Sequence, residues 1–265
     1  MSKAAKFDKA NVATADAAAS AQSVIIEQPK TMMVALEITG TAPMIQNCFS
    51  QKAVEEMLKK HMGISVQREA KKPSECVERA IIRNTDDVIC VPPTAVKKAM
   101  LSAASGMKGL KKTQLRTGLY VYGGSLPLKY QEMVPQMDMV RTSGMSRTPD
   151  VRFRPRFEGW SIRLVIEFSD LFRVQTVVDL LNRAGSVGLG EWRPEKDGTY
   201  GTFRVTRHIS DKKEIAEVMS MCRPGLKPLV IPDWAMNADI KPELLAKIVA
   251  GERGEETEED EEASK

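Results

Sequence analysis

The sequence lacks the cysteine and histidine patterns that mark metal sites and disulfide frameworks. Its four cysteines form no CxxC pair, and its two histidines, His61 and His208, lie far from them in sequence. Zinc sites and small disulfide-bonded domains both need closely spaced ligating or pairing residues. We therefore predict no metal, no cofactor, and reduced, buried thiols in a cytoplasmic protein.

Long apolar runs are also missing. The longest, residues 121–128, is broken by glycines and is far shorter than the roughly 18 residues that cross a bilayer. The first residues do not have the basic-then-apolar layout of a secretory signal, so nothing predicts export. The 265 residues are otherwise ordinary for a globular protein, with 42% hydrophobic and 28% charged residues, and suffice for one large domain or two small ones.

The net charge of +4 is unevenly distributed along the chain. Residues 251–265 hold eight acidic and two basic side chains, a net of −6, so residues 1–250 carry +10. A basic body with an acidic tail suits a polyanion-binding protein whose tail competes for the binding surface; a tail that serves only solubility is the alternative. We predict a disordered arm over residues 1–30, one domain over 31–250 and a disordered acidic tail over 251–265.

Apolar periodicity predicts the order of the elements. Alternation with period two, clearest over residues 160–168, predicts strands, which we place at 32–38, 86–91, 119–122, 151–157, 160–168 and 202–206. Period 3.6 predicts helices, which we place at 51–62 after a Ser50 cap, 95–105 after a Thr94 cap, 170–185, and 241–250. His61 and Val174 fall on the inward faces of their helices. Residues 125–148 are polar and Met-rich, and we interpret them as an irregular insertion that packs only when a partner is present.

This order of strands and helices predicts an α+β fold with a ferredoxin-like, RRM-type antiparallel sheet. Helices should cover one face of the sheet and leave the other free for a ligand. Pro155 cannot donate to a strand ladder, so the strand over 151–157 should lie at an edge or a bend.

A glycine-rich loop over residues 188–201 leaves a helix and enters a strand, unlike a dinucleotide-binding loop or a P-loop. Glycines allow close approach of backbone N–H groups to phosphate, basic residues add charge, and aromatic rings stack on bases or pack under the loop. The candidate contacts in this loop are Gly188, Gly190, Trp192, Arg193, Lys196, Gly198, Tyr200 and Gly201. The alternative is that the glycines serve only a tight turn.

Three segments of the chain resemble the RAMP superfamily, which includes the backbone subunits of CRISPR effector complexes. They are the first strand with its proline turn (34–45), the Val91-Pro92-Pro93-Thr94 helix start with Lys97 and Lys98, and the helix, glycine loop and strand over 170–205. The stretch 191–197 makes this loop longer than the family's usual one, and a phage or mobile-element relative is equally compatible. The resemblance implies RRM-like folds that grip the backbone of a single strand, often as repeating subunits, with Lys97, Lys98 and the loop in contact.

Two further basic groups are candidate phosphate contacts. Arg152, Arg154 and Arg156 alternate along one strand, about 6.6 Å apart, which is close to a nucleotide repeat; a solvated strand face is the alternative. A second cluster combines Lys108, Lys111, Lys112 and Arg116, for which the alternative is a loop that simply collects lysines.

Together these features predict non-catalytic binding of single-stranded nucleic acid, RNA favoured, by a protein that associates with itself or with other effector subunits and not with membranes. Three alternatives remain open. They are a phage or mobile-element single-stranded DNA-binding or annealing protein, a RAMP-type endoribonuclease that uses His61 or His208, and a structural subunit of a particle. We expect no enzyme, because neither histidine has a nucleophile and an orienting acid at a recognisable spacing.

Overall fold

The computed structural model describes residues 30–64, 70–107, 109–141 and 149–236. Several predicted features lie outside these residues. They are the arm over 1–30 except Lys30, Lys108, the helix over 241–250 and the acidic tail over 251–265. Backbone contacts divide the chain into Met1–Lys30 and Thr31–Lys265, and every helix and strand of the described residues belongs to the second unit.

The main sheet is built around β1 (Thr31–Gly40), which pairs antiparallel with β8 (Ser161–Ser169) on one side and β9 (Phe203–Ile209) on the other. On its far side β8 pairs antiparallel with β4 (Leu119–Val121). Helix α3 (Pro93–Ala103) precedes β4 and helix α5 (Val174–Val187) precedes β9. The spatial order β4-β8-β1-β9 is that of a ferredoxin-like βαββαβ unit, so the predicted fold class is confirmed.

Two short strands extend this sheet along the other half of β8. β5 (Leu126–Lys129) pairs with β8 through Leu128 and Ile162, and β3 (Cys90–Val91) pairs with β5. The strand predicted over 86–91 is therefore reduced to its last two residues.

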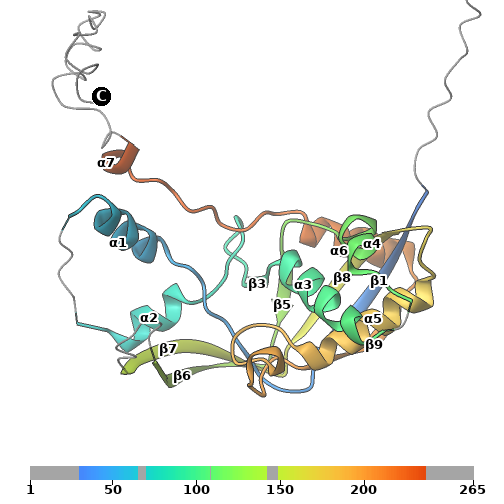
Figure 1. Ribbon diagram of the computed structural model, residues 1–265, viewed down its shortest axis with the longest axis horizontal. Coiled ribbons are helices and arrows are strands. Elements are labelled where there is room, and N and C mark those ends of the chain that lie inside the picture. Colours follow the sequence, from blue (N-terminus) through green and yellow to red (C-terminus); the bar gives the residue numbers. More distant parts are fainter. Residues whose placement is uncertain (1–29, 65–69, 108, 142–148, 237–265) are drawn as a thin grey trace, which may run out of the picture. The chain divides into compact units, whose positions relative to one another are not determined.

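Helices α3 and α5 lie side by side on one face of the sheet (Figure 1). The alternation in β8 explains the core that they cover, because Ile162, Leu164, Ile166 and Phe168 are all fully buried. This is the helical layer that the sequence predicted.

The second face of the sheet is not left free, because helix α6 (Lys212–Cys222) packs against β8 and β5. Asp211 caps this helix by accepting from the backbone N–H groups of Lys213 and Glu214. Arg163 lies on the opposite pleat from Ile162, and its Nη1 lies 3.4 Å from Glu214 Oε1. The prediction of an open second face is therefore wrong over the area that α6 covers.

The boundaries of α3 and α5 differ from the predicted ones for local reasons. Thr94 does not cap α3, because Pro93 takes the first helical position and Pro92 takes the cap. Helix α5 begins at Val174, which is 43% exposed instead of inward. Gly185 does not end α5; a Cβ there would lie 1.8 Å from the Phe203 carbonyl oxygen, so this glycine lets the helix approach β9 closely.

Residues predicted as an irregular insertion form a hairpin. β6 (Glu132–Arg141) and β7 (Pro149–Glu158) pair antiparallel along their whole length, and the two-residue strand β2 (Met44–Ile45) pairs with the end of β7. The strand over 151–157 was predicted at an edge or a bend; β7 is the middle strand of this sheet, but β2 pairs only with its Arg156 and Phe157. Pro155 is tolerated there because it faces Pro135 and lies just beyond the residues of β7 that β2 pairs with.

Helix α1 (Gln51–His61) begins at the predicted cap, with Ser50 Oγ accepting from the Ala53 backbone N–H. It has no buried residue, however, and Met57 and His61 are exposed instead of inward. The sequence analysis did not predict five short elements, namely α2 (Pro73–Arg79), η1 (Ala104–Gly106), α4 (Lys112–Gly118), η2 (Pro194–Lys196) and α7 (Asp233–Met236). Within the described ranges, no helix has the length and apolar character needed to cross a membrane.

All four cysteines are free thiols. Burial raises the pKa of Cys90 to about 12 and that of Cys222 to about 11. Cys48 and Cys76 are only half-buried, so the prediction of buried thiols holds for two of the four.

Candidate functional site

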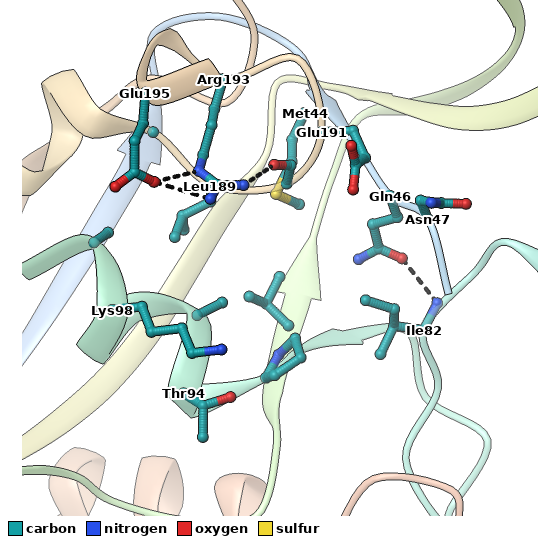
Figure 2. A pocket seen from close by; sticks show the side chains of 16 residues that line it. Met44, Gln46, Asn47, Ile82, Thr94, Lys98, Leu189, Glu191, Arg193 and Glu195 are labelled. Atoms are coloured by element: carbon teal, nitrogen blue, oxygen red, sulfur yellow. Dashed lines mark hydrogen bonds and ion pairs between the residues drawn. The ribbon is translucent and has the colours of Figure 1, made fainter. Parts of the chain in front are cut away.

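A cavity of about 390 Å³ lies between the first turns of α3, the residues around β2 and the glycine loop (Figure 2). It brings together two segments that the sequence analysis selected separately, namely the helix start with Lys98 and the loop that begins at Gly188. Its lining residues are Met44, Gln46, Asn47, Ile82, Val91, Pro92, Thr94, Ala95, Lys98, Ala99, Gly188, Leu189, Gly190, Glu191, Arg193 and Glu195.

The glycine loop is closed by hydrogen bonds to the protein itself. The N–H of Leu189 donates to Gly201 O at 2.9 Å, that of Gly201 to Pro43 O at 2.7 Å, and that of Glu191 to Ile45 O at 2.9 Å. Tyr200 N–H donates to Trp192 O at 2.9 Å. These N–H groups are therefore not open donors for phosphate, contrary to the expectation for this part of the loop.

Each of the four loop glycines has a structural reason of its own. Gly188, Gly190 and Gly201 have φ between +72° and +82°, which L side chains rarely adopt. A Cβ on Gly198 would lie 1.8 Å from Trp192 O, and one on Gly201 would lie 1.8 Å from Leu189 O. The loop needs these glycines to fold, whether or not a ligand approaches it.

A clamp ties the loop to α3. Glu195 Oε1 accepts from Ser102 Oγ at 2.6 Å, and Glu195 Oε2 accepts from Arg193 Nε at 3.0 Å. Arg193 Nη1 donates to Gly190 O at 2.9 Å. The Ser102 hydroxyl and then the Arg193 guanidinium hold the pKa of Glu195 below its ordinary value. Arg193 therefore reaches the cavity largely neutralised, as a structural residue of the loop.

One of the residues that line the cavity, Gln46, has a buried side-chain amide. Gln46 is 2% exposed; its Nε2 donates to Cys90 O at 2.9 Å and its Oε1 accepts from Ile82 N–H at 2.9 Å. Both ends of the side chain are thus engaged with the backbone. Gln46 holds the segment that follows β2 against β3, which fixes one wall of the cavity.

The remaining charged groups at the cavity are Lys98 and Glu191. Lys98 is exposed and extends from α3 toward the cavity. Glu191 lines the cavity on the side of the glycine loop (Figure 2). The uncapped N-terminus of α3 adds partial positive charge on the side of Lys98. The site therefore combines a cationic wall, an acidic residue and apolar surface.

The other sequence-predicted loop and lysine candidates do not line this cavity. Lys97 Nζ donates to Arg116 O at 2.9 Å and so joins α3 to α4. Lys111 and Lys112 are exposed at the start of α4, and Lys196 is exposed in η2. Trp192 is 37% exposed, and Tyr200 is half-buried.

The arginine stripe lies on one face of β7 as predicted, but it is not a row of open cations. Arg154 is 3% exposed, and its Nη1 lies 3.6 Å from Asp138 Oδ2 of β6. Burial lowers the pKa of Arg154, and the carboxylates of Glu191 and Asp138 oppose that shift. Arg152 and Arg156 pair with carboxylates of their own strand, Asp150 at 3.8 Å and Glu158 at 2.8 Å.

Sequence reasoning missed Gln46, Asn47 and the distinct roles of Glu191 and Glu195. β2 has only two residues and shows no period, so its contribution to the cavity was not readable. Of the two histidines, His208 is exposed on β9, with Nδ1 3.1 Å from Ser210 Oγ, and His61 ends α1. Within the described residues no group of three or more His, Cys, Asp or Glu side chains is arranged to hold a metal ion.

Comparisons with known proteins give structural neighbours only; the sequence matches no protein-family profile and no curated protein. A chain of the type III-B Cmr-beta structure bound to cognate target RNA has a TM-score of 0.42 and 13% identity, over 68% of this chain and 60% of that chain. Cmr6 from Pyrococcus furiosus has a TM-score of 0.36 and 8% identity, over 67% and 98% of the two chains. The chain thus spans 60% of the length of the first neighbour. Likeness at this level of identity and TM-score assigns neither a family nor a function to this chain.

Proposed function

We propose that this protein binds single-stranded nucleic acid, RNA in preference to DNA, at the cavity between α3 and the glycine loop, without cleaving it. The observation that carries the proposal is the meeting, in one cavity, of the helix start and the glycine loop that the sequence selected independently. The positive end of α3 and Lys98 attract a phosphate, and the apolar wall accepts a base.

The proposal assigns the residues different weights. Of the two cations that line the cavity, Lys98 is the one without an ion pair among the described residues, so it should contribute most to phosphate binding. Arg193, held by Glu195, keeps the loop in shape. Arg154 is buried, and it belongs to the hairpin's own structure.

Salt-dependent binding tests the proposal. Affinity for a labelled single-stranded RNA should fall log-linearly with salt, with a slope of about −0.7 per neutralised phosphate. Lys98→Ala should weaken binding at low salt and flatten the slope by about 0.7. Lys129→Ala removes an exposed lysine at the end of β5, outside the cavity, and is the matched control. Equal effects of the two variants would remove the cavity from the site.

The same samples test the alternatives. A matched DNA strand bound more tightly than RNA would favour the DNA-binding or annealing protein. RNA fragments on a denaturing gel would overturn the non-catalytic proposal, and loss of cleavage in His208→Ala would identify the base. Particles that form without nucleic acid would favour the structural subunit.

Two finer parts of the proposal concern assembly and the tail. If copies line up along the strand, the number of bound copies should rise in steps with strand length, which analytical ultracentrifugation measures. If the acidic residues 251–265 compete with nucleic acid, their removal should tighten binding at low salt and have little effect at high salt. Weaker binding after truncation would contradict the competition.

A further inference from the structure

The cavity contains a carboxylate that phosphate binding does not need. Glu191 lines the cavity together with Gln46 and Asn47 (Figure 2). Its side chain has no hydrogen bond or ion pair with another described residue, although its charge opposes the lowering of the pKa of the buried Arg154. This long-range role leaves both carboxylate oxygens without a hydrogen-bond donor among the described residues.

The position of Glu191 is fixed by the backbone on both sides. Its N–H donates to Ile45 O at 2.9 Å, and Ile45 and Glu191 form an antiparallel bridge. A Cβ on the preceding Gly190 would lie 2.3 Å from Ile45 O, so the loop and β2 are in direct contact at this point. Glu191 is therefore held in place at the cavity.

Glu191 differs from the other carboxylate of the loop. Both oxygens of Glu195 are occupied by Ser102 and Arg193, so Glu195 has a structural explanation. Glu191 keeps its acceptor capacity for a ligand, and an ionised carboxylate is an acceptor only. The ligand group beside it must therefore present N–H or O–H donors.

Among ligand groups with N–H or O–H donors, the other residues of the cavity favour a nucleobase. Ile82, Pro92 and Ala95 are partly exposed in the cavity and supply apolar surface suited to a flat ring, with the buried Met44 and Leu189 behind them. Lys98 provides a donor on the α3 side of the cavity. A volume of about 390 Å³ lies within the usual range for a small-ligand site and accommodates one base with its sugar.

Among the four bases, guanine matches this pattern of groups. Its Watson–Crick edge carries two adjacent donors, N1–H and the N2 amino group, which a carboxylate accepts together. Uracil offers one N–H between two carbonyl oxygens, and adenine and cytosine place an unprotonated ring nitrogen next to their amino group. Guanine also presents O6 and N7, the acceptors that lysine recognises.

We propose that the cavity selects a single unpaired guanine, with Glu191 accepting from N1–H and N2 and with Lys98, whose ammonium has three N–H donors, donating to O6 or N7 in addition to its phosphate contact. This inference rests on the proposed function, because it assumes that the cavity meets a nucleic-acid strand. It adds a base preference at one position to binding that is otherwise insensitive to sequence.

Single-base substitutions in one oligonucleotide test the guanine preference. The full-length chain is titrated with labelled uridine oligonucleotides of about 12 residues that carry one central guanine, inosine or adenine. Guanine should bind about ten-fold more tightly than adenine, the size expected of one bidentate base contact. Inosine lacks the N2 amino group and should fall between them.

Variants assign the preference to the carboxylate. Glu191→Gln replaces one acceptor oxygen by a donor, so it should abolish the guanine preference while affinity for the all-uridine strand is kept or increased. Glu167→Gln on β8, outside the cavity lining, removes the same charge and should leave the preference unchanged.

The outcomes separate the two proposals. Failure to bind any of the oligonucleotides would overturn the proposed function and the guanine site with it. Tight binding with equal affinity for guanine, inosine and adenine would overturn the guanine site alone. A guanine preference that survives Glu191→Gln would place the selectivity elsewhere and also overturn this assignment.

Discussion

The glycine loop and the arginine stripe of β7 were both selected from the sequence as nucleic-acid contacts, and their surroundings in the structure differ. In the loop, backbone N–H groups and glycines are engaged by the protein, while the Glu191 side chain stays available at the cavity. In the hairpin, the arginine face is paired and partly buried, and the other face exposes Met137 and Met139, each 68% exposed.

The difference shows that residue type does not decide which side of an element meets solvent. Arginines spaced along a strand suggest an outward cationic stripe, but a carboxylate on the neighbouring strand, here Asp138 opposite Arg152 in register, pairs with Arg154, which is buried. Glycines suggest an open ligand loop, but the same residues allow the loop to close on β2.

The largest expected effect is on the loop. Gly201→Ala places a Cβ 1.8 Å from Leu189 O at a residue with φ of +72°. We expect a loss of about 3 kcal/mol in the free energy of unfolding, from left-handed backbone strain and overpacking together. Chemical denaturation measures it. Gly225→Ala is the control, because nothing lies within 4 Å of its added Cβ; a stable Gly201→Ala protein would mean that the loop opens in solution.

The hairpin should respond strongly at Arg154 and weakly at Arg152. Arg154→Met leaves the Asp138 carboxylate, 13% exposed, without its cation, and we expect a loss of about 2 kcal/mol. Arg152→Met removes an arginine that is 44% exposed, and the change should stay within about 0.5 kcal/mol. Equal effects in urea denaturation would contradict the buried position of Arg154.

The exposed face of the hairpin should tolerate polar residues. Met137→Ser and Met139→Ser remove side chains that make little contact, so each free energy of unfolding should stay within about 0.5 kcal/mol of the wild type. Met44→Ser, at a position 1% exposed, is the contrasting control and should be clearly destabilising. Large losses at Met137 and Met139 would show that another surface covers this face in solution.

The smallest effect concerns pH and the clamp at Glu195. Because its folded pKa is lowered, the clamp stabilises the fold above the ordinary carboxyl pKa, and this contribution is lost as pH falls through the folded value. The melting temperature of the wild type should exceed that of Glu195→Gln near neutral pH by a small amount, since the group is partly exposed. The two curves should converge below about pH 4; a constant gap down to that pH would rule out the ionic clamp.

The regular core was predictable because its signals are local. The alternation in β8 and β1 and the Ser50 cap act within a few residues of themselves, and these elements are found where the sequence places them. The ferredoxin-like order followed from the order of those elements along the chain.

The hairpin and the cavity were less predictable because they depend on contacts between distant residues. Gln136, Met137, Asp138 and Met139 do alternate, and this signal for a strand was outweighed by the polar, Met-rich composition. The roles of Gln46 and Glu191 depend on the bridge between Ile45 and Glu191, which joins β2 to the glycine loop. No local sequence pattern predicts that contact. Helix α6 shows the same limit, since the ion pair of Glu214 with Arg163 joins residues 51 positions apart.

Of the strands in the main sheet, β1 is synthesised first, and both strands that pair with it are synthesised much later. β1 lies between β8 and β9. Thr31 pairs with Ser169 and Gly40 pairs with Phe203, so both ladders join residues that are far apart in the sequence. The loop-closure entropy of such distant pairing slows folding. On the ribosome, the main sheet cannot be completed until β9 has emerged, so β1 has at most one of its two neighbouring strands during that interval.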